Sequence, residues 1–464
     1  VDFSTLDAVV AQVRAGAEPM PAYPASELSD ATLSGMHTWL VDLPPPGPPE
    51  PNPDTIATQQ GVDVDLVVSG LDHPIALAWH GDDLYVSTNG DVFPDQGEQP
   101  GAIHRIVDGR AVQVAQRLER PLGLLWVDDA LWVSQRGRVT VLTDPDGDGV
   151  LDQRKDVVTG LPVDGLHQNN GLVAGPDGRV WMGMGSATNA GVEDEPNNSI
   201  LAISADGGLE VMATGFRNPF GLAVLDGRVY ATDNGIDPPV LESAPEEVNA
   251  VDVGGFYGHP YMAGTQRRRD GGPPATFPVV ELTPHASANG IAGGTGSAFP
   301  DLQGKLIVAE FGSYLQRFRS AGRQIVVVDP ATATVSTWAS GFTGRPLDVA
   351  VGPDGHVYVT DFEQGAVWRF FPSDRVRTVF RPSFDCRRAQ TAVEHAICND
   401  PELSRLDGQL AKAYSDALDG VQGQARIALR DAQRAWLVER DACAEDPWPV
   451  LCTRDAMVAR IDAL

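Results

Sequence analysis

Alternating apolar and polar residues mark short strands along the middle of the chain, and each strand follows a tight turn. The segment RVWMGMG at 179–185, for example, comes directly after the turn GPDG and alternates as a half-buried strand does. The same pattern occurs six times between residues 63 and 372: an apolar entry, a turn such as PDG or LDG, and a strand that ends near a small or acidic residue. This repetition predicts a sheet architecture built from similar units.

The spacing of the six copies predicts how the units assemble. Their equivalent apolar residues are separated by 47, 48, 50, 69 and 58 positions: Leu77, Leu124, Leu172, Leu222, Ile291 and Val349. A four-stranded unit cannot bury both of its faces alone, so units at a period of roughly 40 to 50 residues close into a propeller. We therefore expect a mainly β chain with a six-bladed β-propeller at 63–372, whose polar entry segments, including His167, converge on one face.

Helical patterns flank this region. The pattern predicts a short helical segment at 1–43, which a proline-rich linker (44–62) separates from the propeller. After a second linker at 373–382, residues 383–464 are rich in Ala, Leu, Arg and Glu at helical spacing.

The cysteines indicate how the last region is stabilised. All four lie there, at spacings of 12, 45 and 9: Cys386, Cys398, Cys443 and Cys452. These spacings fit neither paired C-x-x-C zinc ligands nor C-x-x-C-H haem attachment. We expect two disulfides in a small helical domain, with three connectivities open, and hence an oxidising compartment: periplasmic, secreted or cell-surface.

The charge balance excludes some partners. With 34 basic and 63 acidic residues, the net charge of −29 disfavours nucleic acid and anionic membranes. No apolar run approaches the roughly 18 residues that a membrane helix needs, so we expect no membrane insertion.

The segment DPDGDGVLD has the spacing of a calcium loop. Its carboxylates occupy positions 1, 3, 5 and 9 around a glycine at position 6: Asp144, Asp146, Asp148 and Asp152. Position 12 is Lys155 instead of the usual bidentate acid. The segment therefore predicts either a second calcium site of modest affinity or an acidic hairpin turn.

Several motifs of the repeat region resemble, in order, those of the soluble pyrroloquinoline quinone (PQQ) dehydrogenases, the glucose and sorbosone dehydrogenase family. GLHQNNGLVAGPDGRVW is similar to the segment that holds the family's general base, which implies this role for His167. GFRNPFGLAV resembles the family's RNPQGLA and implies that Arg217 and Asn218 lie near the quinone. ATDNG, followed by PEEVNAVDVGGFYGHP, resembles the calcium loop and implies that the carbonyls of Gly235 and Ile236 bind calcium.

The sequence departs from this family where the cofactor is clamped. In GRPLDVAVGPDGHVYVTD, Arg345 is retained, but Leu347 replaces a second arginine. The family's glutamine in the second blade is missing at Pro121-Leu122. No lysine matches the fifth-blade cofactor ligand, for which Arg317 or His285 are the available substitutes.

The residue types suit the chemistry that the resemblance implies. A neutral imidazole accepts a hydroxyl proton, and a cation and guanidinium groups stabilise charge that develops on a quinone. We expect PQQ- and calcium-dependent oxidation of a sugar or another alcohol or aldehyde, with electrons passing to a cytochrome. The alternative is a propeller without cofactor that serves as a binding or scaffold module, with a structural His167 and with Arg217 in an ion pair between blades. Calcium-dependent lactone hydrolysis is disfavoured, because the blade entries lack a ring of acidic and amide ligands.

Both flanking regions resemble other families. VRAGAEPMPAYPASELSDATLSGMHTWLVDL is similar to the C-terminal half of a class I cytochrome c, where Met20 corresponds to an axial haem ligand. The C-x-x-C-H half is not in this sequence, so we expect haem c only if an upstream segment exists. The motifs FDC, AICNDPEL and QRAWLVERDAC resemble the LprI-like family of lysozyme-inhibitor domains over 383–464.

Overall fold

The computed structural model describes residues 50–464 except 60, 90–99, 242–243, 315–320, 375–381, 385–387 and 447–448. These described residues belong to the second of the two units into which the chain divides, residues 50–464. Met20, Arg317, Cys386 and the segment similar to cytochrome c lie outside the described residues, so the expectations for them stay predictions.

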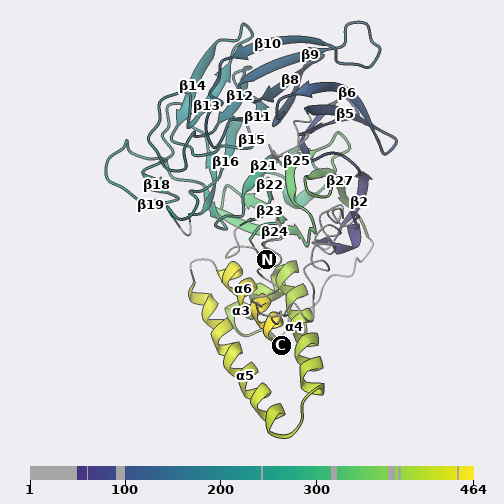
Figure 1. Ribbon diagram of the computed structural model, residues 1–464, viewed down its shortest axis with the longest axis vertical. Helices are drawn as coiled ribbons and strands as arrows, with labels where there is room; N and C mark the ends of the chain where they lie inside the picture. Colours follow the sequence, from purple (N-terminus) through teal and green to yellow (C-terminus); the bar gives the residue numbers. More distant parts are fainter. Residues whose placement is uncertain are drawn as a thin grey trace, which may run out of the picture. The chain divides into compact units, whose positions relative to one another are not determined.

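Six antiparallel sheets follow one another along the second unit and confirm the predicted propeller (Figure 1). Blade 1 contains β3 (Pro74–His80), β4 (Asp83–Thr88), β5 (Gly101–Val107) and β6 (Arg110–Leu118). Blade 2 contains β7 (Gly123–Val127), β8 (Ala130–Gln135), β9 (Arg138–Thr143) and β10 (Gln153–Thr159). Blade 3 contains β11 (Asn169–Ala174), β12 (Val180–Met184), β13 (Ser199–Ile203) and β14 (Leu209–Thr214).

The last three blades are less uniform than the first three. Blade 4 contains β15 (Leu222–Leu225), β16 (Arg228–Asp233), β17 (Glu246–Ala250) and β20 (Val280–Leu282), with the hairpin β18 (Met262–Ala263) and β19 (Gln266–Arg267) inserted before β20. Blade 5 contains β21 (Ala288–Gly293), β22 (Leu306–Glu310), β23 (Gln324–Asp329) and β24 (Thr334–Ser340), and the 3-10 helix η3 (Pro300–Leu302) precedes β22. Blade 6 contains β25 (Pro346–Val351), β26 (Val357–Asp361) and β27 (Ala366–Pro372).

Strands from the start of this unit close the ring. β2 (Val62–Val68) pairs with β27 and completes blade 6, while β1 (Ala57–Thr58), which follows the 3-10 helix η1 (Pro53–Thr55), pairs with β24 of blade 5. Joining both ends of the repeat region in one sheet removes an open sheet edge. Residues 53–62, which the sequence pattern placed in the linker, therefore form part of the propeller.

The innermost strands surround a narrow central cavity of about 110 Å³. All six residues that the sequence repeat identified as equivalent line it: Leu77, Leu124, Leu172, Leu222, Ile291 and Val349. Hydroxyls on second strands bind the neighbouring blades together. Ser87 Oγ donates to the Pro121 carbonyl at 2.9 Å, and Thr360 Oγ1 donates to the Ile75 carbonyl at 2.8 Å.

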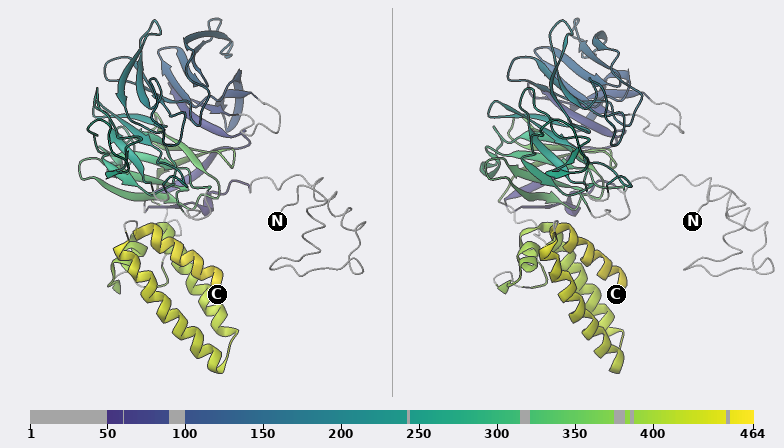
Figure 2. Two further views of the ribbon diagram at one scale, coloured as in Figure 1. Left: turned by 60° about the vertical axis from the view of Figure 1, so that its left-hand side comes forward. Right: turned by 90° about the vertical axis from the view of Figure 1, so that its left-hand side faces the viewer.

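The C-terminal region is helical, as predicted (Figure 2). It contains α3 (Ala392–Asn399), α4 (Pro401–Asp419), α5 (Gly423–Asp441), the 3-10 helix η6 (Ala442–Glu445) and α6 (Pro449–Ala463). Thr391 and Glu394 form a capping box at α3, and the Asp400 side chain caps α4 by accepting from the Leu403 N–H. No helix in the described part of the chain is both long and apolar enough to cross a membrane.

Disulfides hold the helical domain, as the cysteine pattern predicted. Cys443 and Cys452 are bonded to each other, and Cys398 is also disulfide-bonded. The buried core of the domain packs around the first of these bonds and consists of Val393, Ile397, Leu403, Leu406, Leu410, Trp436, Cys443 and Met457.

Polar contacts join the helical domain to blade 5. Thr337 Oγ1 donates to Asp400 Oδ2 at 3.0 Å, and Arg454 Nη2 donates to Gln324 Oε1 at 3.2 Å. Beside these bonds, Leu451 packs against two small buried residues of the propeller, Ala286 and Ala321.

Candidate functional site

The polar segment before β11 divides into amides with structural roles and one histidine. Asn169 Nδ2 donates to Ser134 Oγ and to the Gln135 carbonyl, both at 2.8 Å, and so joins blade 3 to blade 2. Asn170 Nδ2 donates to Asn218 Oδ1 at 2.9 Å and joins blade 3 to the entry of blade 4. Gln168 Nε2 also donates to a backbone carbonyl, that of Arg120, at 3.3 Å. Because buried amides that are satisfied in this way stabilise the fold, His167 is the residue of this segment that remains for chemistry.

Hydrogen bonds fix the protonation pattern of His167. Its Nδ1 lies 3.0 Å from the Ser186 carbonyl and 3.1 Å from Ser186 Oγ, whose own proton goes to the Thr188 carbonyl. Only an Nδ1–H can satisfy these acceptors, so Nε2 carries the lone pair. Burial, and then the nearby charge of Arg217, lower the pKa of His167 to about 3. The imidazole is therefore neutral at neutral pH.

A glycine makes room for this histidine. A Cβ atom on Gly185 would lie 2.5 Å from His167 Cβ and 2.8 Å from Asn218 Oδ1. A larger residue at 185 would push both side chains away, so the close approach of His167 and Asn218 depends on this position.

Arg217 is buried, with only 4% of its surface exposed, and its guanidinium has several hydrogen-bond partners. Its Nη2 pairs with Asp237 Oδ2 at 2.5 Å, its Nε donates to Asn189 Oδ1 at 3.1 Å, and its Nη1 donates to the Asn234 carbonyl at 3.3 Å. An acid partner is what allows a guanidinium to remain charged in a buried site. The structure therefore adds Asp237, which the sequence motifs did not single out, to the predicted group.

The structure brings together some of the predicted site residues but not all of them. His285 Nδ1 lies 3.8 Å from Asp237 Oδ1, and Asn218 Nδ2 donates to Asn234 Oδ1, so both belong to the Arg217 group. Arg345 has a different set of partners. Its Nη1 donates to the Gly312 carbonyl at 2.9 Å, its Nε lies 3.4 Å from Glu363, and its guanidinium stacks 3.7 Å from the Tyr314 ring centre.

Leu347, at the position of the second family arginine, is buried in an apolar cluster with Phe311 and Leu124. A charged side chain could not replace it there without a new partner. Apolar packing therefore occupies this position of blade 6 in place of an arginine.

A small chamber of about 20 Å³ lies beside Arg217, where the sequence predicted calcium. Gly235 and Ile236 line it, as expected, but so do the carboxyl groups of Asp233 and Glu247. These two residues are directly opposite each other on β16 and β17, and like charges in such a pair are destabilising. Burial, followed by their mutual repulsion, raises the pKa of Asp233, and burial raises that of Glu247.

The chamber's donor set fits a divalent cation. Two buried carboxyl groups and nearby carbonyls are the oxygen ligands that calcium prefers, and the volume suffices for one ion. A cation would also remove the unfavourable pairing of the two acids. Sequence reasoning missed both acids because their roles depend on register across the sheet, although both lie within the quoted motifs ATDNG and PEEVN.

The predicted second calcium loop forms an acidic turn. Ligand atoms of Asp144, Asp146 and Asp148 lie within 4.8 Å of one another, while Asp152 is not part of this group. Both oxygens of Asp144 accept backbone hydrogen bonds, and that from the Gly149 N–H is the main cause of the lowered pKa of Asp144. A calcium ion here stays a prediction.

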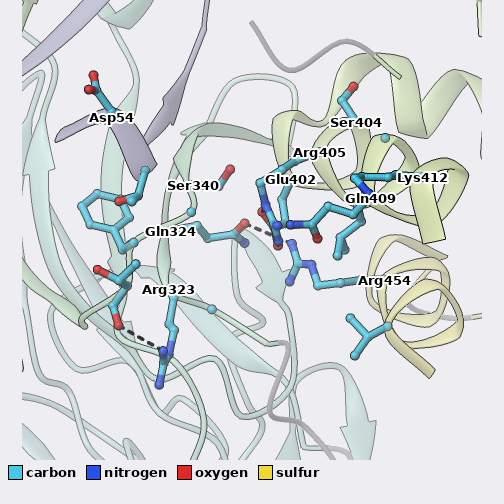
Figure 3. Close-up of a pocket in the computed structure, with 18 residues that line it drawn as sticks. Asp54, Arg323, Gln324, Ser340, Glu402, Ser404, Arg405, Gln409, Lys412 and Arg454 are labelled. Carbon is cyan, nitrogen blue, oxygen red and sulfur yellow. Dashed lines mark hydrogen bonds and ion pairs between the residues drawn. The ribbon is translucent and has the colours of Figure 1, made fainter. Parts of the chain in front are cut away.

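A large cleft lies elsewhere, between blade 5 and the helical domain (Figure 3). It has a volume of about 970 Å³, and none of the predicted catalytic residues lines it. Charged groups on its wall pair locally: Arg405 with Glu402, and Lys412 with Asp416. We therefore place the candidate reaction site at His167 and Arg217 and regard this cleft as the seam between two domains.

Comparisons with solved structures identify the class of propeller. A crystal structure from Thermus thermophilus, described as an oxidoreductase (glucose dehydrogenase), is 25% identical, with a TM-score of 0.52 over 67% of this chain and all of that one. The PQQ-bound aldose sugar dehydrogenase of Streptomyces coelicolor shares the fold at 21% identity, with a TM-score of 0.51 over 68% of this chain and 99% of that one. The fold is thus the six-bladed propeller of soluble sugar dehydrogenases.

Family models assign the two parts of the chain. A model described as "Domain of unknown function (DUF7133)" matches residues 48–370, and the chain belongs to this family. Residues 386–463 match a model described as "Lysozyme inhibitor LprI". The lipoprotein LprI of Mycobacterium tuberculosis is 34% identical over 90 residues, which are 19% of this chain and 44% of that protein. This chain therefore spans less than half of that relative.

Proposed function

We propose that the protein is an extracytoplasmic PQQ- and calcium-dependent dehydrogenase that oxidises a sugar or another alcohol or aldehyde. The observation that carries the proposal is the arrangement of His167: its Nδ1–H is committed to Ser186, which leaves the Nε2 lone pair for a proton, and the charge of Arg217 acts on the same ring. Alcohol oxidation by hydride transfer needs a base that accepts the hydroxyl proton and a positive charge that stabilises the negative charge developing on the hydride acceptor. Sugar-dehydrogenase neighbours support the reaction class, and the lipoprotein relative supports the location.

In this proposal, His167 Nε2 accepts the proton of the substrate hydroxyl, while the carbon that bears this hydroxyl loses a hydride. When bound, PQQ would accept that hydride. The Ser186 carbonyl keeps the imidazole in the correct tautomer and stabilises the imidazolium that forms. Because the Asp237 carboxylate holds the Arg217 guanidinium in place, its charge is in position before the reaction begins.

Four residues would hold the cofactor: Arg217, Asn218, His285 and Arg345. A calcium ion in the chamber lined by Asp233 and Glu247 would lie next to this group. We propose a partner cytochrome as the electron acceptor, because a reduced quinone must be reoxidised.

The alternative, a binding module without cofactor, is supported by Leu347. Its burial among apolar residues supports a chain in which core packing replaces one part of the cofactor clamp. Calorimetric titration of PQQ into the calcium-loaded, cofactor-free protein separates the two functions. Saturable one-to-one binding that a chelator abolishes supports the dehydrogenase, and no binding at micromolar PQQ supports the module.

His167→Ala tests the catalytic role. It should lower dye-linked oxidation by at least about a thousandfold and leave PQQ affinity within about twofold, since a base contributes to the transition state. The control is His80→Ala, which changes a half-exposed histidine stacked on Trp126. Loss of PQQ binding in His167→Ala would instead show a structural histidine.

The pH profile provides a second readout. The folded-state pKa of His167 lies near 3, far below the usual 6.5, so the base stays deprotonated as the pH falls through 6. We expect kcat/KM to show no loss attributable to a group of pKa 6.5 between pH 5 and 8, measured with stopped-flow dye reduction. A fall with an apparent pKa near 6.5 would contradict the buried environment of His167.

A further inference from the structure

A second buried histidine lies beside the proposed site and has no role in it. The segment before His259 runs alongside the segment before Arg217: Tyr257 N–H donates to the Thr214 carbonyl, and His259 N–H donates to the Gly215 carbonyl, both at 2.8 Å. This pairing places His259 next to Arg217, and both residues line the small chamber. At this position the sequence reads GHP, where the sugar-dehydrogenase motif GGNYGWP has a tryptophan.

The His259 ring is buried without being satisfied. Only 6% of the residue is exposed, and its Nε2 has no hydrogen-bond partner among the residues that the structure describes. An unsatisfied buried polar atom is costly and rare in folded proteins. A ligand that bonds to Nε2 would remove this cost.

Arg268 adds a positive charge to the same place. It follows the hairpin β18–β19, its backbone N–H donates to the Tyr261 carbonyl, and its Nη1 donates to the Pro260 carbonyl at 3.0 Å. No carboxylate in the described part of the chain pairs with this half-buried guanidinium. Both Arg217 and Arg268 also act electrostatically on the His259 ring.

The balance of charge indicates the ligand. Asp237 pairs with Arg217, whereas Arg268 has no ion-pair partner among the described residues and acts on the His259 ring. The buried acids of the chamber, Asp233 and Glu247, accept backbone N–H bonds instead. An N–H of His259 and a guanidinium together match the two oxygens of one carboxylate, whereas a neutral hydroxyl would satisfy only one of them.

We propose that His259 and Arg268 form a carboxylate-binding subsite next to His167. The inference deepens the proposed function, on which it rests, by naming the chemistry of the ligand. Two sources carry this group: a sugar-acid substrate, or the carboxylates of the quinone cofactor.

The test is calorimetric binding of D-glucuronate, D-glucose and PQQ to the cofactor-free full chain loaded with calcium. Glucuronate and glucose differ only at C6, so their affinity ratio reports on the carboxylate. We expect glucuronate to bind about tenfold or more tightly, because a hydrogen bond between charged groups has that effect. Arg268→Gln and His259→Asn should bring the ratio close to one.

Arg267→Gln is the matched control. It removes the same charge one residue away, from an exposed side chain whose Nη1 donates to the Gly271 carbonyl, and it should keep the wild-type ratio. The Arg268 side chain is partly exposed and lies outside the apolar core, so we expect Arg268→Gln to stay folded. Melting curves check the fold of Arg268→Gln and of His259→Asn.

The outcomes distinguish the two sources. A glucuronate preference that disappears in both variants assigns the carboxylate to the substrate. If the wild type shows no preference but Arg268→Gln lowers PQQ affinity about tenfold, the carboxylate is the cofactor's. If neither ligand responds to either variant, the subsite does not exist. A wild type that prefers glucuronate but binds no PQQ would overturn the proposed function and support the subsite.

Discussion

Blades 4 and 5 place a buried acid at the same repeat position but surround it differently. Asp233 ends β16 and lies opposite Glu247, whereas Glu310 ends β22 and lies opposite Gln324. In blade 5, Gln324 Nε2 donates to Glu310 Oε2 at 2.6 Å, and its Oε1 accepts from Arg454 of α6. In blade 4 the partner is a second acid, and the pair lines an internal chamber.

The difference shows how one repeat supports two uses. An acid opposite an amide is satisfied within the protein and contributes to docking of the helical domain. In blade 4, Asp233 accepts from the Asn218 N–H and Glu247 from the Gly264 N–H, but two facing acids repel when both are charged, so the pair favours a cation from outside. A change from amide to acid at one cross-strand position is therefore enough to turn a structural position into a candidate ligand site.

Breaking the blade 5 contact should have the largest effect. Arg454→Met leaves the Gln324 carbonyl oxygen without this donor and removes the positive charge near buried Glu310. We expect a loss of about 3 kcal/mol in docking, equivalent to roughly hundredfold faster opening. Hydrogen exchange of β23 and α6, followed by mass spectrometry, measures it.

The control for this prediction is Arg434→Met on α5, where 79% of the arginine side chain is exposed. It should leave exchange in both elements unchanged. Equal exchange in Arg454→Met and the wild type would show that docking does not depend on the blade 5 acid.

Exchanging the two pairs tests the calcium chamber. At calcium a hundredfold above its dissociation constant, binding should stabilise the wild type by about 2.7 kcal/mol, and Glu247→Gln should lose this gain. Thermal unfolding with calcium or chelator measures the difference, in an Asp146→Asn background that removes one carboxylate of the acidic turn.

The reverse change, Gln324→Glu, places two acids opposite each other in blade 5. We expect it to destabilise the protein by about 2 kcal/mol without calcium, since buried like charges repel, and calcium should recover part of this loss because the new acid pair resembles that of blade 4. Calcium stabilisation that survives in Glu247→Gln would contradict the role of the blade 4 pair.

The smallest effect concerns the pH dependence of stability. Burial raises the pKa of Glu310 to about 7, above its usual 4.5, so the folded state binds this proton more tightly than the unfolded state. The contribution of Glu310 to stability is complete below about pH 4.5 and decreases as the pH rises towards 7. Glu310→Gln should therefore gain about 1 kcal/mol relative to the wild type between pH 6 and 7 in urea unfolding. If the difference in unfolding free energy between Glu310→Gln and the wild type stays the same from pH 6 to pH 7, Glu310 does not titrate in this range.

Much of the fold was predictable because it depends on local pattern. Six copies of an apolar entry and a tight turn predicted six blades, and their equivalent residues line one central cavity. The clustered cysteines predicted a disulfide-bonded helical domain, which the Cys443–Cys452 bond confirms. The linker was predicted less well, since β1 and β2 form only by pairing with strands about 280 and 300 positions later in the chain.

The sequence by itself determined the repeat, the spacing of its copies and the residue types that chemistry would need, because turns and alternation act over a few neighbouring residues. Only the tertiary structure decided which polar side chains are satisfied and which are not. Asn169 lies in the same polar segment as His167, but its side chain is hydrogen-bonded to blade 2. Arg268 and Arg267 are neighbours of the same residue type, but the Arg268 side chain is bonded beside the site, to the Pro260 carbonyl. Burial, cross-strand pairing and electrostatic balance depend on residues far apart in the chain, so no local pattern contains them.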